Sequence, residues 1–209
     1  MANGHLEIWA RAAASAVPYV GGPAEIVYSG YRDRAASRGL EFLGSLAERF
    51  QDLAELDVRL AASNPLDAVF GRALRAAIES GLADKRIALG RVVAAALDDE
   101  AVVDRSGMLV DTLAQIEAPH VKALVSVREA VQEVKDRGEW PIRATGAEHE
   151  ILAHVIQVGN QFDDTVIRLL KNLGLIYAAE ATEEWFVHDL TPYGYELLAF
   201  IVSPTDGTG

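Results

Sequence analysis

The chain has 209 residues, of which 50% are hydrophobic and 24% are charged, so its composition is that of an ordinary globular protein. It contains no cysteine, which excludes disulfide bonds, thiolate zinc sites and a cysteine nucleophile. A net charge of -12 opposes sequence-independent attraction to nucleic acid or anionic lipid, because both need clustered Lys and Arg.

The first 23 residues predict a short helix and a tight turn. Small apolar side chains dominate residues 5–17, and the sequence PYVGGP at residues 18–23 ends this helix. Glu7 and Arg11 interrupt the apolar run, so it does not match a secretory signal. No charge-free run reaches the ~20 residues that span a bilayer. We therefore expect no transmembrane segment and a cytoplasmic location.

A long helix is predicted next, from Pro23 to about Ala62, because apolar residues recur at steps of three and four. This stripe consists of Leu40, Leu43, Leu46, Phe50, Leu53, Leu56 and Leu60. Asn64 is expected to be the N-cap of a following helix that ends at Gly81. Residues 82–97 predict a further helix, and its lack of polar residues after Arg91 favours a central position.

Two more helices complete the first part of the chain. Ser106 is expected to cap a helix that runs through Ile116, and Pro119 opens another that ends near residue 135. Residues 1–138 are therefore predicted to form one all-helical domain. Residues 139–145, which include Trp140-Pro141, predict a linker.

The pattern changes in residues 146–204, which we predict to be a second domain with a flexible tail at residues 205–209. Two helices are expected at residues 147–158 and 161–173. The inward side of the second helix is predicted to carry Phe162, Val166, Leu169 and Leu170. Two short strand candidates, residues 175–178 and 185–187, flank a polar turn, which is typical of a hairpin. Thr191 is expected to cap a final helix that has Pro192 in its first turn.

The sequence LGLI at residues 173–176 and the sequence LTPYGYELLAF at residues 190–200 resemble winged helix-turn-helix domains. The first exits a helix into a wing hairpin, and the second closes the domain. The resemblance implies a mainly α fold, with an N-terminal helical bundle and a C-terminal winged-helix-like domain that has a small β-hairpin. The helix at residues 161–173 would then enter the DNA major groove. The N-terminal part, with VPYVGGP at residues 17–23 and DKRIALGRVVAAALDD at residues 84–99, resembles uncharacterised helical bacterial proteins, a likeness that implies no activity.

The charge of this second domain argues against DNA. Between residues 144 and 209 the basic residues are Arg168 and Lys171, against ten Asp and Glu. Asp163 and Asp164 begin the helix that would enter the groove, and three glutamates lie at or near the wing tip, where phosphate would be met. These three are Glu180, Glu183 and Glu184. The acidic pair is also typical of helix capping, because a helix N-terminus is electropositive.

Candidate metal and catalytic residues do not form a known pattern. In AEHEILAH the histidines His149 and His154 are five residues apart, so they cannot share one helix face as the ligands of a zinc protease do. The acidic residues between Asp98 and Asp104 lack the spacing of a calcium loop, and His120 is predicted to start a helix. We expect neither an enzyme nor a bound metal or cofactor.

The sequence thus favours a non-enzymatic interaction or regulatory protein that uses an acidic winged helix for protein contacts. The partner can be a second copy of the chain, and we expect a homo-oligomer. The candidate contact residues lie on the predicted recognition helix and wing. They are Gln161, Asp163, Asp164, Arg168, Lys171 and Glu183.

Two alternatives stay open from the sequence. One is a DNA-binding transcriptional regulator in which Arg32, Arg34 and Arg38, or an assembled dimer, supply the missing positive field. The other is a membrane-directed helical effector that inserts the PYVGGP turn.

Overall fold

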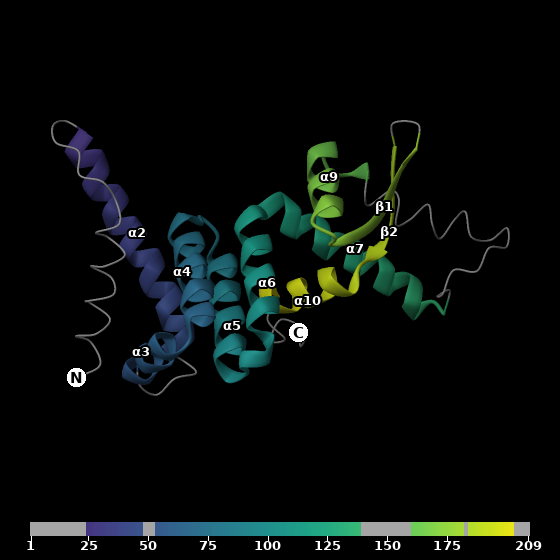
Figure 1. Cartoon of the computed structure of the whole chain (residues 1–209). Helices are drawn as coiled ribbons and strands as arrows, with labels where there is room; N and C mark the ends of the chain where they lie inside the picture. Colours follow the sequence, from purple (N-terminus) through teal and green to yellow (C-terminus); the bar gives the residue numbers. More distant parts are fainter. Residues whose placement is uncertain (1–23, 48–52, 139–159, 182–183, 203–209) are drawn as a thin grey trace. The chain divides into compact units, whose positions relative to one another are not determined.

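The computed structural model describes residues 24–47, 53–138, 160–181 and 184–202. In these ranges the chain is mainly helical and has a two-stranded antiparallel sheet, which confirms the expected fold class at this level (Figure 1). None of the described helices is long and apolar enough to cross a membrane. Several predicted features lie outside the described residues: the PYVGGP turn, the linker at residues 139–145, the helix at residues 147–158 with His149 and His154, Glu183 and the tail.

The chain divides into two compact units, Met1–Gln115 and Ile116–Gly209. The first is a bundle built on α5 (Ala83–Asp98), which contacts the other helices of the unit. Its helices are α2 (Ala24–Ala47), α3 (Leu53–Ala62), α4 (Asn64–Glu79), α5, the short 3-10 helix η1 (Glu100–Val102) and α6 (Val103–Gln115). A Cβ atom on Gly90 of α5 would overlap Ser45 Oγ of α2, so this glycine permits the close approach of the two helices. The central position predicted for α5 is confirmed.

Basic side chains from neighbouring helices satisfy carbonyl groups at three helix C-termini. Arg38 of α2 donates to Ile78 O of α4 at 3.1 Å, and Arg59 of α3 donates to Leu97 O of α5 at 3.1 Å. Lys85 of α5, only 4% exposed, donates through Nζ to Ala114 O of α6 at 3.1 Å. The last carbonyls of a helix lack intrahelical partners and lie at its negative end, so each cation stabilises both the packing and the helix terminus.

The starts of two helices differ from the prediction. Ser63 is the N-cap of α4, without a side-chain cap bond, and Asn64 and Pro65 lie in the first turn. The sequence of α6 begins at Val103, so Ser106 is a buried residue inside the helix and does not cap it. In both places the prediction chose a residue type that is common at N-caps, but the helix begins before that residue.

The second unit contains the β-hairpin and the helices that pack on it. Its described elements are α7 (Ala118–Asp136), α9 (Asp164–Asn172), β1 (Ile176–Ala181), β2 (Glu184–Leu190) and α10 (Pro192–Ile201). The strands pair antiparallel from Ile176 with Leu190 to Ala181 with Glu184, with an irregularity after Tyr177. The predicted hairpin is therefore confirmed, and both strands are longer than expected.

The boundary between the units differs from the one expected after residue 138. The helix α7 contacts α9, β2 and α10, and it belongs to the second unit. Its buried stripe of Ala123, Leu124, Val127, Ala130, Val131 and Val134 supplies apolar surface within that unit. The boundary therefore moves to Gln115 and Ile116, because the apolar stripe of α7 is covered by the elements that follow it.

The two motifs behind the winged-helix resemblance meet in one junction. Gly174 ends α9 at φ +69 in a Schellman arrangement, in which the Leu175 N–H donates to Leu170 O at 2.9 Å. The Thr191 N–H donates to Leu175 O at 3.0 Å, and its hydroxyl donates to Gly174 O at 2.6 Å. The same hydroxyl accepts the Gly194 N–H at 3.0 Å, so Thr191 caps α10 as predicted. A Cβ on Gly194 would overlap Leu175 O.

The close approach of Gly194 to Leu175 in this junction predicts that even alanine at position 194 lowers the stability of the protein. Alanine normally stabilises a helix relative to glycine by about 1 kcal/mol. At Gly194 we expect Gly194→Ala instead to destabilise the protein by about 1–3 kcal/mol, because the added methyl group meets the backbone of Leu175. Gly71→Ala in α4 is the matched control, since a Cβ there has no neighbour within 4 Å. Urea unfolding of both variants measures the effect, and equal stabilisation by the two would contradict it.

Candidate interaction surface

The helix α9 begins at an aspartate cap. Asp163 Oδ1 accepts the Thr165 N–H at 2.8 Å, and Asp163 is the N-cap of the helix. Hydrogen bonds from the Thr165 hydroxyl, and then from its N–H, hold the pKa of Asp163 below its usual value. The charged carboxylate is therefore favoured at the end of the helix where the macrodipole is positive.

The remainder of α9 is amphipathic. Val166, Ile167 and Leu170 are buried, and the helix contacts α7 and β1. Ile167 was not among the residues expected to face inward, whereas Leu169 is only half-buried. The exposed side carries Asp164, Thr165, Arg168, Lys171 and Asn172.

Charged groups of both signs lie close together on this exposed side. Asp164, Arg168 and Lys171 fall within about 60 degrees of one another around the helix axis. Arg168 Nη2 lies 2.9 Å from Asp164 Oδ2, and both side chains are about half exposed. An exposed pair of this kind contributes at most about 1 kcal/mol, so it orients the guanidinium more than it stabilises the fold. We call Asp164, Arg168 and Lys171 the α9 face.

A second polar cluster in this unit was not predicted from the sequence. The Tyr195 hydroxyl of α10 donates to Asp189 Oδ1 of β2 at 2.7 Å, and Lys135 Nζ of α7 lies 5.5 Å from the tyrosine ring centroid. Burial, and then the hydrogen bond and charge of Asp189, raise the pKa of Tyr195, while Arg128 opposes the shift. Tyr195 and Asp189 are only six residues apart, but Lys135 comes from a helix far away in the sequence, so no local pattern predicts the whole cluster.

The residues expected to support other functions have structural roles where the structure describes them. Arg38 is bound to the α4 terminus, so of the three arginines proposed for a positive field only Arg32 and Arg34 are exposed on α2. His120 Nδ1 accepts the Glu117 N–H at 3.0 Å and completes a capping box at the start of α7, as its position predicts. Asp99 Oδ1 accepts the Ala101 N–H at 2.9 Å. Across the described ranges, no three His, Asp or Glu side chains gather as metal ligands.

The Tyr195 cluster predicts a distinct alkaline behaviour. Because its pKa is raised, the neutral hydroxyl contributes stability that is fully present below pH ~10 and is lost as the pH rises above that value. Asp189→Asn removes the carboxylate charge and should move the ionisation of Tyr195 to lower pH. Tyrosinate absorbance of the wild type, Asp189→Asn and Tyr195→Phe measures this. An unchanged titration in Asp189→Asn would contradict the assigned cause.

Of the six predicted contact residues, the structure brings Asp164, Arg168 and Lys171 onto one face. Gln161 is exposed in the turn before α9, the side chain of Asp163 is engaged in the cap, and Glu183 lies outside the described residues. The chain as a whole matches no protein-family model, no curated protein and no solved structure.

Proposed function

We propose that this chain is a non-enzymatic interaction protein whose second unit is an acidic winged helix that contacts a protein through the α9 face. One observation carries the proposal. The exposed start of α9 presents two carboxylates, one engaged in the cap and the other holding the Arg168 guanidinium. In a DNA-binding helix-turn-helix this end of the helix meets bases and phosphates.

Electrostatics support a protein as the occupant of this face. The second unit, Ile116–Gly209, contains 7 Lys and Arg against 15 Asp and Glu, a net charge of -8. Phosphate neutralisation by Lys and Arg dominates non-specific DNA binding and contributes much of specific binding. A face that begins with Asp163 and Asp164 repels phosphate at the place where DNA would need attraction. A protein surface with Lys or Arg residues pairs with the same carboxylates.

The two ends of the α9 face carry opposite charges, with Arg168 between them held by Asp164, and this arrangement supports a homodimer. Asp164 and Lys171 lie on the same side of the helix, about 10 Å apart along the axis. If a second copy of α9 lies antiparallel to the first, Asp164 faces the partner's Lys171 and Lys171 faces the partner's Asp164. A two-fold contact of this kind repeats each favourable pair. Tyr177 on the adjoining strand β1 is 53% exposed and offers an apolar anchor.

Charge exchange tests the two-fold contact. Asp164→Lys or Lys171→Asp alone should weaken dimerisation about tenfold, because each places like charges opposite one another twice. The double variant Asp164→Lys/Lys171→Asp should restore it, since the pairs reform with reversed polarity. Light scattering over a concentration series measures the mass. A wild-type mass of one chain, or a double variant as weak as the single ones, would refute the two-fold contact.

DNA binding provides the second test. The wild type should not bind pooled genomic DNA fragments at about 50 mM or about 200 mM salt. Asp163→Asn/Asp164→Asn keeps an N-cap residue and should raise DNA affinity at low salt if the aspartates are what repel phosphate. Asp57→Asn/Asp67→Asn gives the same change in net charge at exposed positions of the first unit. Tight wild-type binding that weakens steeply with salt would establish a DNA-binding regulator instead.

A further inference from the structure

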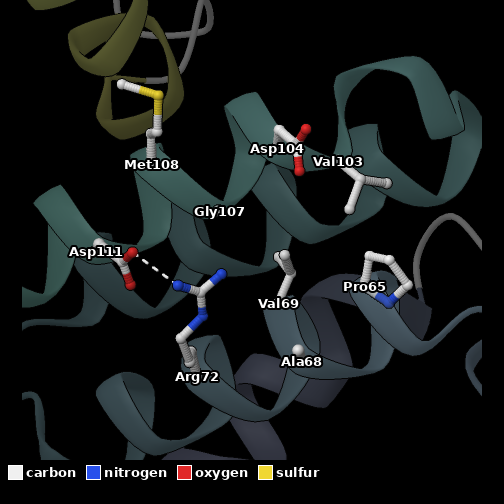
Figure 2. Close-up of a pocket in the computed structure, with 9 residues that line it drawn as sticks. All are labelled: Pro65, Ala68, Val69, Arg72, Val103, Asp104, Gly107, Met108 and Asp111. Atoms are coloured by element: carbon white, nitrogen blue, oxygen red, sulfur yellow. Dashed lines mark hydrogen bonds and ion pairs between the residues drawn. The ribbon is translucent and has the colours of Figure 1, made fainter.

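The first unit contains an open hollow between α4 and α6, remote in sequence from the α9 face. Its volume is about 270 Å³ (Figure 2). The lining residues from α4 are Pro65, Ala68, Val69 and Arg72, and those from α6 are Val103, Asp104, Gly107, Met108 and Asp111. Apolar side chains line most of this wall, and charged groups lie at its rim.

A glycine and an ion pair keep the hollow open. Arg72 Nη1 lies 2.7 Å from Asp111 Oδ2, so the arginine side chain extends from α4 to α6 (Figure 2). A Cβ on Gly107 would come within 2.8 Å of Arg72 Nη2, and any side chain there would displace the guanidinium. The guanidinium therefore lies over the Gly107 backbone, where this residue has no side chain of its own to take up space.

The rim is acidic around an exposed methionine. Asp104, Met108 and Asp111 follow one another at steps of four and three, so they share one side of α6. Met108 is 54% exposed. Asp111 is paired with Arg72, whereas no group in the described ranges makes a hydrogen bond or ion pair with the Asp104 carboxylate. A flexible Met side chain with a polar rim beside it is typical of adaptable protein-binding surfaces.

The openness of the hollow favours a protein side chain over a small molecule. Sites for drug-sized ligands usually enclose about 300–1,000 Å³ and bury most of the ligand. This hollow lies near the lower end of that range and is open to solvent between two helices, so it would bury little of a small molecule. One large apolar side chain fits such a space, and the groove provides room for the helix that carries it.

We propose that the α4–α6 groove, defined by the nine lining residues, docks a basic amphipathic helix of a protein partner. An apolar side chain of this helix enters the hollow beside Val69 and Val103. A Lys or Arg one turn away pairs with Asp104. The groove belongs to the first unit, so this inference does not depend on the function proposed for the α9 face, and each can fail alone. Together they describe a protein with two separate contact surfaces.

Peptide binding tests the groove with the full-length protein. The probe is a fluorescein-labelled amphipathic helix of Leu and Lys, and the control peptide replaces every Lys with Glu. Asp104→Lys and Ala68→Leu should each weaken binding of the Leu/Lys peptide about tenfold, the first by charge reversal and the second by filling the hollow. Ala68 is exposed and leucine is a strong helix former, so this variant should keep the fold. Fluorescence anisotropy gives the affinities.

A matched charge variant separates docking from general attraction to an acidic protein. Asp57→Lys makes the same change in net charge at an exposed position of α3 and should alter the affinity less than twofold, as a substitution outside a contact surface does. An equal loss in Asp57→Lys and Asp104→Lys would overturn the proposal, as would Ala68→Leu with unchanged affinity or equal binding of the Glu peptide. A wild-type dimer that dissociates in Asp104→Lys would also overturn it, by assigning the groove to a second copy.

Discussion

The first unit depends on basic side chains that reach across to the ends of other helices. A helix leaves its last carbonyl groups without partners, and burying them unpaired is costly. Arg38, Arg59 and Lys85 each donate to such a carbonyl, across separations of 40, 38 and 29 residues. The contacts fix α2 to α4, α3 to α5 and α5 to α6. Each of them therefore specifies both where a helix ends and which helix lies beside it.

Contacts of this kind also explain why the surface of the chain is more acidic than its net charge suggests. Arg86 is a second buried cation beside Lys85, since it pairs with Glu41 and donates to Ser80 O at 3.0 Å while only 7% exposed. Buried basic groups of this kind are not available to an external anion. The carboxylates at the rim of the α4–α6 groove remain at the surface, so the exterior favours basic partners more strongly than a charge of -12 suggests.

Local patterns in the sequence predict the elements well and their assembly poorly. The polar side of α9 follows from its periodicity, and Gly174 and Thr191 mark the ends of the hairpin, because these features depend on neighbours a few residues away. The place of α7 could not be predicted, since an apolar stripe shows which side of a helix is buried and not what covers it. Two other features join residues far apart in sequence: Lys135 lies over the Tyr195 ring, and the Arg72 guanidinium lies beside Gly107.

The sequence positions of the helix-end contacts determine the order in which these contacts can form during synthesis. In all three, the basic residue precedes the carbonyl that it binds, and the last acceptor, Ala114, lies one residue before the end of the first unit. On the ribosome, each cation emerges before its acceptor and stays hydrated until the later helix arrives. The Lys85 ammonium can be buried only when nearly the whole unit has left the exit tunnel. The acceptors of Arg38 and Arg59 emerge before Ala114, so the contact between α5 and α6 is the last of the three that can form.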